Sequence, residues 1–312
     1  MAGEVSLRES YGKTLAELGK KYPDIVVLDA DLCPSTMTQY FMREFPDRSF
    51  NLGVAEQNMI GIAAGLAASG KIPFASTFAV FAPGRCFDQV RVSIAQPKLN
   101  VKLVTTHGGI SVGEDGASHQ AIEDLSLICS LPGFTVIVPA DAIETAQAVK
   151  TAAVTEGPFY IRLPRPKLPL VYKEDYRFEI GKAVTMRQGK NVTIIAIGLM
   201  VAPALEAAEA LSGEGIDCRV LNMPTLQPID EAAIIRAAVE TGAIVTAEEH
   251  LEHGGLGSIV AQVTAKNSPV PMEFVALKGY AESGKPAELL KKYGLTSQDI
   301  VQAVRRVLQR RR

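Results

Sequence analysis

Short apolar segments alternate with longer alanine-rich segments along this chain, and that alternation constrains its fold more than any other feature. The short segments have the length of single strands, and the longer ones have the length of helices. Such alternation is typical of an α/β protein whose mainly parallel sheet is covered by helices on both faces. In the first half we expect strands over residues 25–28, 50–53, 72–77, 101–106, 135–138 and 159–163, and helices over residues 56–69, 83–95 and 142–155.

A proline-rich segment divides the alternation into two parts. Residues 164–169 read PRPKLP, and three prolines within six residues do not fit a helix or a central strand, so we expect an extended linker. The sequence therefore predicts two domains, residues 1–170 and 171–312, each a mainly parallel sheet flanked by helices. In the second domain we expect strands over residues 192–197, 219–221, 244–248 and 274–276, and helices over residues 203–211, 231–239 and 258–264.

The last expected helix carries its own start signal. Thr296 is followed three residues later by Asp299, the spacing of a capping box, in which two side chains satisfy free backbone N–H groups. Ile300, Val304 and Leu308 then form an apolar stripe at helical spacing. We therefore expect a capped amphipathic helix at the end of the chain.

Charge and hydropathy argue against several classes of partner. The formal net charge of -2 gives no strong field that would recruit nucleic acid or an anionic membrane. No apolar run approaches the roughly 20 residues that a membrane helix needs, and the first residues lack the apolar core of a signal peptide. The four cysteines form no CxxC pair, so we expect reduced thiols and no zinc site. The sequence predicts a cytoplasmic protein that binds neither nucleic acid nor a membrane.

Polar residues gather directly after the expected strands of the first half, and few do so in the second half. Because catalytic groups of open parallel sheets lie beyond the carboxyl ends of strands, this asymmetry predicts a site in the first domain. The polar positions are Asp29, Asp31, Glu56, the segment 106–120, Arg162 and Arg165.

The segment 106–120, THGGISVGEDGASHQ, is the densest of these positions. It holds two of the four histidines of the chain, together with four glycines. Glycines let a loop adopt positive φ and let backbone approach a ligand closely. The alternative is a mobile surface loop, but such a loop has little need of two histidines.

Glu56 lies at an expected strand-to-helix turn. Behind it, Gly61, Ala64, Gly65 and Ala68 give the helix a face thin enough for close packing against another element. From these residues alone, Glu56 can be either a ligand-binding group or a first-turn carboxylate that matches the helix dipole.

Several segments resemble the transketolase family in the same order and spacing. The segments DADLCPS (29–35), NLGVAEQNM (51–59), STFAVF (76–81), THGGISVGEDGASHQ (106–120) and IRLPRPKLP (161–169) resemble its pyrimidine-binding domain. The segment VTAEEHLEHGGLGS (245–258) resembles its C-terminal domain. The resemblance covers nearly the whole chain and identifies it with the C-terminal half of a transketolase, as found in split, two-chain members of the family.

The resemblance implies that this chain holds the pyrimidine end of thiamine diphosphate. Glu56 matches a catalytic glutamate that hydrogen-bonds the aminopyrimidine ring, where a carboxylic acid that donates to the ring nitrogen favours the imino tautomer. Phe81, with Phe78 nearby, matches an aromatic platform for the pyrimidine, and Asp31 matches an aspartate that lines the cofactor site. The alternative for both phenylalanines is an ordinary core position.

The resemblance also implies a set of substrate-binding residues. His107 and His119 match catalytic residues of the substrate channel, because histidine suits proton transfer near neutral pH. Asp115 matches a residue that accepts a hydrogen bond from a ketose hydroxyl. Phosphate binding is implied for Arg8, Ser35 and Arg165, since forked guanidinium donors suit a phosphate group.

One motif of the family is missing from this sequence. Transketolases bind the cofactor's diphosphate and its metal ion through Gly-Asp-Gly followed by an asparagine, and Gly-Asp-Gly does not occur here. The resemblance therefore implies no metal ligand in this chain. It implies a separate N-terminal subunit that carries the motif, binds Mg²⁺ or Ca²⁺ and shares the cofactor in an α2β2 heterotetramer. The alternative is a metal at GEDG, residues 113–116, but oxygen ligands nearby are sparse.

The implied activity is transfer of a two-carbon ketol unit from a ketose phosphate to an aldose phosphate, a reaction of the pentose phosphate pathway. A 1-deoxy-D-xylulose-5-phosphate synthase and the β subunit of a 2-oxo acid dehydrogenase are alternatives with the same cofactor, and both release carbon dioxide. A non-enzymatic regulatory or binding half is a third alternative. Gln57 and Gly84 depart from the family pattern, which often has histidine and tyrosine there, and they bear on substrate choice.

Overall fold

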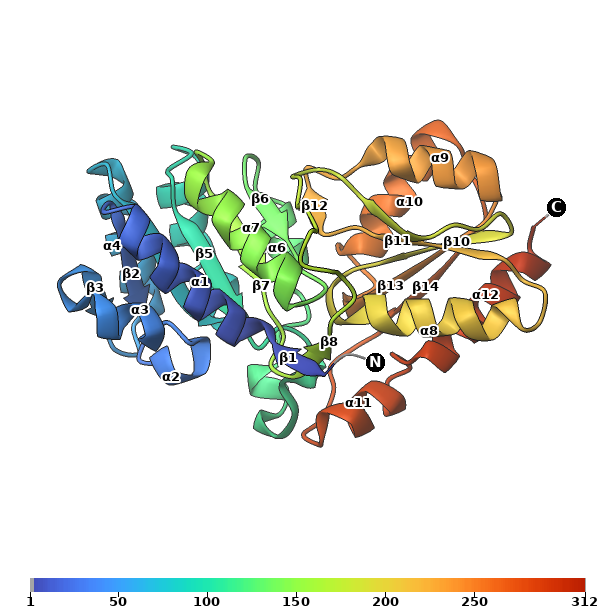
Figure 1. Ribbon diagram of the computed structural model, residues 1–312, viewed down its shortest axis with the longest axis horizontal. Helices are drawn as coiled ribbons and strands as arrows, with labels where there is room; N and C mark the ends of the chain where they lie inside the picture. The colour runs from blue at the N-terminus through green and yellow to red at the C-terminus, as the bar shows by residue number, and fades with distance from the viewer. Residues whose placement is uncertain (1–2, 312) are drawn as a thin grey trace.

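The structure is a computed structural model that describes residues 3–311. Two sheets lie side by side along the long axis of the molecule, each with helices on both faces (Figure 1). The N-terminal half builds most of the first sheet, and the C-terminal half builds the second. The predicted α/β fold with mainly parallel sheets is confirmed.

The first sheet has seven strands among the described residues, in the order β12-β6-β7-β5-β4-β2-β3. The six strands from the N-terminal half are parallel to one another, and all six were predicted. They are β2 (Ile25–Asp29), β3 (Ser49–Asn51), β4 (Ile72–Phe78), β5 (Lys102–Thr106), β6 (Thr135–Ile137) and β7 (Phe159–Arg162). The seventh, β12 (Thr225–Gln227), comes from the C-terminal half and is antiparallel to β6.

Side-chain alternation along the strands explains the two helical layers on this sheet. In β2, Ile25 and Val27 pack with one set of helices, while Val26 and Leu28 pack with the other. Both faces are buried, so the strand is apolar throughout rather than alternating with polar residues. One layer contains α1 (Leu7–Lys21), α3 (Gln39–Glu44) and α7 (Ala142–Val154), and the other contains α4 (Glu56–Ala68) and α6 (Asp124–Cys129).

The second sheet has the order β14-β13-β10-β11-β9. The strands β10 (Val192–Ala196), β11 (Cys218–Asn222), β13 (Ile244–Leu251) and β14 (Met272–Leu277) are parallel, and β9 (Val184–Arg187) is an antiparallel edge strand. The helices α8 (Val201–Ser212) and α12 (Ser297–Gln309) cover one face, and α9 (Glu231–Thr241) and α10 (Leu256–Asn267) cover the other. At the start of α12 the predicted capping box between Thr296 and Asp299 is present.

Two predicted segments differ from the structure. Residues 83–95 do not form one helix: wide turns over Val80–Arg85 and Val90–Ala95 flank the short α5 (Phe87–Gln89), and Ala82 is non-helical. Pro83 explains the non-helical backbone of Ala82, because proline disfavours helical geometry in the residue before it. Within residues 83–95 the interruption is at Cys86, whose ψ is 16°. The proline-rich segment is extended as predicted, but part of it is paired: β8 (Lys167–Pro169) lies antiparallel to β1 (Glu4–Ser6).

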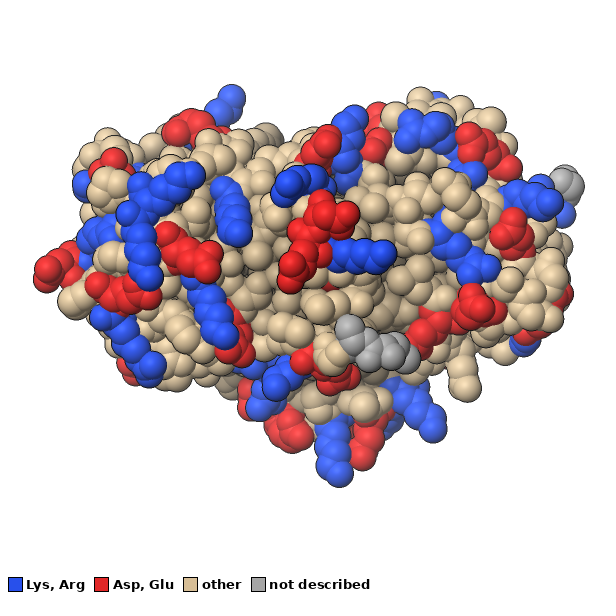
Figure 2. Space-filling model, in the orientation of Figure 1, with Lys and Arg blue, Asp and Glu red and all other residues tan. Residues whose placement is uncertain are grey.

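The remaining sequence expectations concern partners and cysteines. Within residues 3–311, no helix is both long and apolar enough to cross a membrane. Lys and Arg side chains are interspersed with Asp and Glu on the face shown in Figure 2. All four cysteines are free thiols, and Cys86 and Cys218 are buried.

Candidate active site

Four aromatic rings that the sequence placed in the site come together beyond the carboxyl ends of β4 and β5. Phe78 ends β4, His107 follows β5, and their rings stack with centroids 3.8 Å apart. Phe81 also stacks on Phe78, with ring centroids 5.9 Å apart. His119 meets Phe81 edge-on at 5.5 Å. Phe78 and His107 are buried, and the partly exposed rings of Phe81 and His119 form an aromatic surface on which a planar ligand can stack.

Glu56 is the first residue of α4, and its side chain is only 1% exposed. One carboxylate oxygen, Oε2, accepts a hydrogen bond from Nη1 of Arg85 at 2.7 Å. The other, Oε1, is buried and has no hydrogen-bond partner among the described residues. A buried acceptor without a partner costs about 1–3 kcal/mol, so such atoms are rare and call for an explanation. A ligand that donates a hydrogen bond would supply the missing partner.

His107 is buried within this group. Its Nδ1 lies 2.7 Å from Oγ1 of Thr106, and its backbone has a φ of 62°, which is uncommon for a residue other than glycine. Burial, together with the positive charges of Arg8 and Arg165, lowers the pKa of His107 to about 3. The imidazole is therefore neutral near pH 7. In that state its ring nitrogens can donate and accept hydrogen bonds without carrying a charge.

His119 lies at the other end of the glycine-rich loop, in the short turn Ala117–His119. Its Nδ1 is 2.9 Å from Oγ of Ser118, and its side chain is partly exposed. Asp115, in the same loop, is also partly exposed. His119 can therefore reach a ligand that stacks on Phe81, because its ring already meets that phenylalanine. Asp115 lies next to Arg165.

Two arginines lie side by side at the rim of this group. Arg8, near the start of α1, donates from Nη1 to the backbone oxygen of Ser35 at 2.7 Å and from Nη2 to that of Arg165 at 3.1 Å. Arg165 donates to the backbone oxygen of Val112, and its Nη1 lies 4.0 Å from Oδ2 of Asp115. Burial and the nearby charge of Arg165 lower the pKa of Arg8. Two adjacent guanidinium groups favour an anion between them.

Asp31 lies at the same edge of the sheet and is paired with the neighbouring loop. Nδ2 of Asn51 donates to Oδ1 of Asp31 at 2.9 Å, and the backbone N–H of Asp31 donates to Oδ1 of Asn51 at 3.1 Å. Asp29 has a different role, because it is buried and accepts hydrogen bonds from the hydroxyls of Thr36 and Thr38 at 2.7 and 2.9 Å. Asp29 fixes the turn that presents Asp31.

The second domain contributes to this region, although the sequence pattern predicted that it would not. Glu249, at the end of β13, accepts the backbone N–H of Ser111 at 2.6 Å and the Ser111 hydroxyl at 3.2 Å. A Cβ atom at Gly109, whose φ is 81°, would lie 2.0 Å from the Glu249 carboxyl carbon, so only glycine fits there. Burial raises the pKa of Glu249 to about 7. The glycine-rich loop is therefore held from the C-terminal half.

Arg162 supports the same loop and does not line the aromatic surface. Its Nε donates to Oδ2 of Asp124 at 2.9 Å, and its Nη2 donates to the backbone oxygens of Ala121 and Glu249 at 2.9 and 3.0 Å. The side chain is buried, and a Cβ atom at Gly108 would lie 2.6 Å from its Nε. Arg162 is thus a link between the two halves of the protein.

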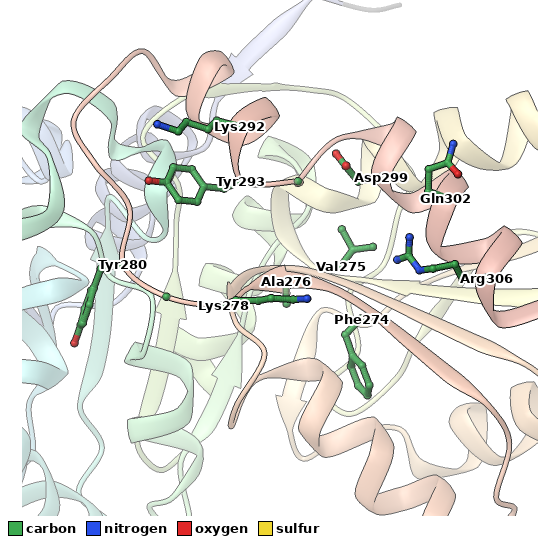
Figure 3. A pocket seen from close by; sticks show the side chains of 12 residues that line it. Phe274, Val275, Ala276, Lys278, Tyr280, Lys292, Tyr293, Asp299, Gln302 and Arg306 are labelled. Atoms are coloured by element: carbon green, nitrogen blue, oxygen red, sulfur yellow. The ribbon is translucent and has the colours of Figure 1, made fainter. Parts of the chain in front are cut away.

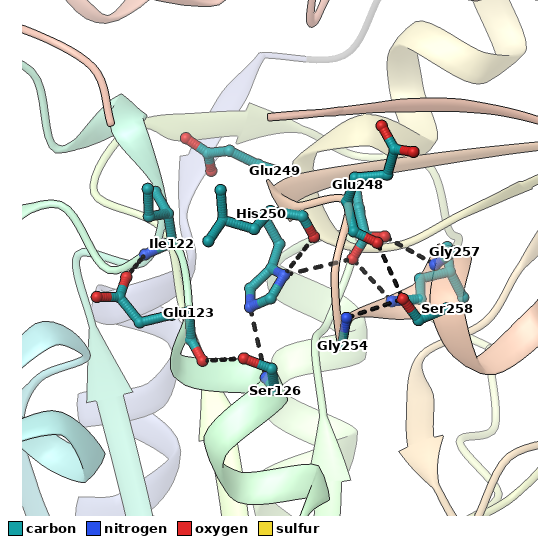
Figure 4. A network of polar contacts seen from close by, with 12 residues as sticks. Ile122, Glu123, Ser126, Glu248, Glu249, His250, Gly254, Gly257 and Ser258 are labelled. Atoms are coloured by element: carbon teal, nitrogen blue, oxygen red, sulfur yellow. Dashed lines mark hydrogen bonds and ion pairs between the residues drawn. The ribbon is translucent and has the colours of Figure 1, made fainter. Parts of the chain in front are cut away.

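A second polar network joins the halves next to Glu249 (Figure 4). Glu248 accepts the backbone N–H groups of Leu256 and Gly257 at 2.8 and 2.7 Å, at the start of α10. Nδ1–H of His250 donates to the Leu251 carbonyl at 2.8 Å, so its Nε2 accepts the N–H of Ser126 at 3.4 Å. The sequence signal for these contacts was the run EEH inside a strand that is otherwise apolar.

A cavity of about 560 Å³ lies elsewhere, between β14, α11 (Pro286–Lys292) and α12 (Figure 3). Lys278, Lys292 and Arg306 line it, but Lys292 is paired with Glu282 and Arg306 with Glu273. It contains none of the site residues predicted from the sequence. The aromatic group with Glu56 carries more distinctive chemistry than this open, solvated cavity. Among residues 3–311, no three His, Cys, Asp or Glu side chains gather so as to hold a metal ion.

Comparisons with known proteins identify the family of this chain. The family models for the transketolase pyrimidine-binding domain and the transketolase C-terminal domain match residues 3–171 and 181–300. A protein of Methanocaldococcus jannaschii named as a transketolase C-terminal section is 47% identical over 302 residues, which are 96% of this chain and 95% of that protein. The 6-deoxy-6-sulfo-D-fructose transketolase subunit SqwH of a Clostridium species is 44% identical over 98% of this chain and 95% of its own length.

A solved structure is also similar over its full length. It is described as a split gene transketolase, inactive β4 tetramer, and it is 53% identical, with a TM-score of 0.92 over 99% of this chain and 100% of that chain. The two family models and these relatives together cover nearly every residue of the sequence. The chain therefore belongs to the transketolase family, with the pyrimidine-binding and C-terminal domains of that family.

Proposed function

We propose that this chain is the C-terminal subunit of a two-subunit transketolase that moves a two-carbon ketol unit from a ketose phosphate to an aldose phosphate. The observation that carries the proposal is Oε1 of Glu56, a buried oxygen without a partner among the described residues. The other oxygen of the same carboxyl group is bonded to Arg85, whose guanidinium carbon lies 4.4 Å from the centre of the Phe81 ring. We assign residues 1–170 to the pyrimidine-binding domain and residues 171–312 to the C-terminal domain.

The residues of this chain fit the pyrimidine end of thiamine diphosphate. Oε1 of Glu56 would bond the ring nitrogen, and Phe81, supported by Phe78, would stack on the ring. Asp31 would line the same site at the edge of the sheet. The cofactor supplies an electron sink for cleaving the bond next to a ketone, and the protein supplies orientation and proton transfer.

The loop residues would act on the sugar. His107, neutral near pH 7, would exchange hydrogen bonds with a ketose oxygen without bringing a charge into the site. His119 would move a proton at the reacting hydroxyl, and Asp115 would accept from a neighbouring hydroxyl. We therefore assign catalytic roles to Glu56, His107 and His119.

Arg8 and Arg165, with Ser35 beside them, would bind the anionic end of the sugar. Phosphate and sulfonate are both tetrahedral anionic groups, and a pair of guanidinium groups can bind either of them. The Clostridium relative is named for a sulfonated sugar. We propose phosphate as the group that this chain takes, and a sulfonated donor is the comparison substrate.

The diphosphate and the metal would be held by a partner subunit. We propose an N-terminal subunit that carries Gly-Asp-Gly and binds Mg²⁺ or Ca²⁺, joined to this chain in an α2β2 heterotetramer. Two relatives that match along nearly their whole length, one named a C-terminal section and one named a subunit, support this arrangement. The similar solved structure, an inactive tetramer of β chains from a split-gene transketolase, supports it as well.

Reconstitution tests the proposal. The purified chain with thiamine diphosphate and Mg²⁺ should show no ketol transfer, and addition of the partner subunit should produce transfer without release of carbon dioxide. Release of carbon dioxide would instead indicate one of the two related decarboxylating activities. Full turnover by the chain alone would exclude the two-subunit arrangement, and no turnover with any candidate partner would favour a regulatory half.

A further inference from the structure

Arg85 touches both residues that would hold the pyrimidine, although the sequence patterns did not single it out. Its Nη1 donates to Oε2 of Glu56 at 2.7 Å, and its guanidinium carbon lies 4.4 Å from the centre of the Phe81 ring. The backbone of Arg85 is itself held from α4, because Nε2 of Gln57 donates to its carbonyl oxygen at 3.0 Å. Arg85 therefore bridges the start of α4 and the broken segment that follows β4.

The ion pair between Arg85 and Glu56 differs from an ordinary surface pair. Exposed pairs contribute little because both groups are solvated, but here the Glu56 side chain is 1% exposed while that of Arg85 is 47% exposed. The Arg85 guanidinium group thus takes the place of the water molecules that would hydrate an exposed carboxylate. Loss of that partner would leave an uncompensated charge at a buried position, which is unfavourable.

The pair also decides which carboxylate oxygen is available. Arg85 occupies Oε2, so Oε1 is left buried and unpartnered among the described residues. The guanidinium group against Phe81 restrains that ring at the same time. One side chain therefore fixes the hydrogen-bonding group and the stacking group relative to each other.

We propose that Arg85 is a positioning residue, which holds the Glu56 carboxyl so that Oε1 alone faces the pyrimidine ring. The inference rests on the proposed function, since it gives Glu56 its ligand. Arg85 acts through Glu56 and Phe81 and does not contact the reacting atoms.

The test uses the chain assembled with its partner subunit and measures binding of thiamine diphosphate by titration calorimetry. Arg85→Met removes the charge but keeps an unbranched side chain against Phe81, and it should weaken binding about 10- to 100-fold, as expected for a charge-assisted hydrogen bond. Arg85→Lys should restore part of the affinity. The matched control is Arg91→Met, because Arg91 is equally exposed at 46% and forms one ion pair, with Asp88 at 2.8 Å. It should change the affinity less than about twofold.

A double-mutant cycle separates positioning from a structural role. In a Glu56→Gln background, Arg85→Met should cause little further loss of cofactor affinity, because the group that it positions is already changed. Equal losses in both backgrounds, or no loss in the wild-type background, would overturn the proposal. Failure of the proposed function gives a different result: Glu56→Gln alone would then leave cofactor affinity and turnover unchanged.

Discussion

At the scale of single residues, the two oxygens of Glu56 decide what the site can do. Glu56→Gln keeps the shape of the side chain but replaces one oxygen with an amide, which cannot transfer a proton to the pyrimidine nitrogen. We expect turnover in the assembled enzyme to fall by about 10²–10⁴ at saturating cofactor, the range that acid–base groups contribute. Steady-state kinetics measure this, and a thermal unfolding midpoint close to that of the wild type would show that the fold is intact.

Arg165 separates binding of the sugar's anion from the chemistry. If it binds the phosphate equally in the ground and transition states, Arg165→Ala should raise KM with little change in kcat. We expect a loss of about 1.5–3 kcal/mol, or roughly 10- to 150-fold, for phosphorylated donors. Hydroxypyruvate, which has no phosphate, should be used almost normally. His119→Ala should impair both donors, because it acts near the reacting carbons.

The contacts of Arg165 define the control for that experiment. Its Nη1 also lies 3.4 Å from Oε2 of Glu114, an exposed loop carboxylate. Glu114→Gln removes this charge without touching the arginine, so it should leave hydroxypyruvate turnover unchanged and preserve or improve binding of phosphorylated donors. Equal losses for both donors in Arg165→Ala would mean that the arginine only anchors the loop.

Residues that follow strands could be predicted, whereas residues that act through distant contacts could not. Glu56, Phe81 and His107 lie in local motifs at the carboxyl ends of strands, so pattern and resemblance together were enough to select them. Arg85 acts through a carboxylate 29 positions away, and Glu249 through a serine 138 positions away. No spacing rule in one sequence reveals such pairs. The first depends on how α4 packs against the segment after β4, and the second depends on how the two sheets pack.

At the scale of elements, the glycine-rich loop depends on β13 of the second sheet. Glu249→Ala would remove the acceptor for the backbone and hydroxyl of Ser111 and leave a buried N–H unpaired. We expect the loop to become mobile and kcat to fall by about tenfold or more, since the loop carries both site histidines. Hydrogen exchange of the loop peptide measures the first effect, and kinetics measure the second.

Glu249→Gln is the matched variant, because an amide can accept from the Ser111 N–H and donate to its hydroxyl. It should keep the loop ordered and retain most of the activity. Strong loss of loop protection in the glutamine variant, or none in the alanine variant, would contradict the proposed role of the carboxyl group.

Glu249 should also make the free energy of unfolding depend on pH. Folding raises the pKa of Glu249 from its ordinary 4.5 to about 7, so the folded protein binds this proton more tightly than the unfolded chain. Its contribution to the free energy of unfolding is therefore fully present below about pH 4.5 and is lost as the pH rises through about 7. Glu249→Gln should flatten that part of the stability profile, measured by urea unfolding at several pH values.

Most strands were predictable from local pattern, whereas some short strands were missed because their partners decide them. Most parallel strands of the first sheet are short apolar segments of the length of a single strand. The start of α12 has a local capping box. The short strands β8 and β12 were missed, because each exists through a partner distant in sequence. The non-helical backbone of Ala82 has a local cause, since proline disfavours helical geometry in the residue before it.

At the scale of the whole molecule, the two sheets share more than a linker. One apolar cluster runs from the α4 side of the first sheet to α9 and α10 on the second, and β12 of the C-terminal half completes the first sheet. A buried polar group joins the halves on the other side. Glu144 of α7 accepts from the Tyr176 hydroxyl at 2.6 Å and from Nδ2 of Asn222, in β11, at 3.0 Å.

We therefore predict that the two halves unfold together, and that Glu144 helps to couple them. Glu144→Ala would leave the Ala140 N–H and the Tyr176 hydroxyl without their acceptor and would remove one of the acceptors of Asn222, so we expect a loss of about 3 kcal/mol or more in the free energy of unfolding. Glu144→Gln keeps an acceptor oxygen and should lose less.

Urea unfolding with pulsed hydrogen exchange measures whether the two halves unfold together, by comparing peptides from β4 and β10. In the wild type both should lose protection at the same urea concentration, as a single cooperative unit does. Separate transitions for β4 and β10 would mean that the shared cluster and Glu144 do not couple the halves, and that each domain folds on its own.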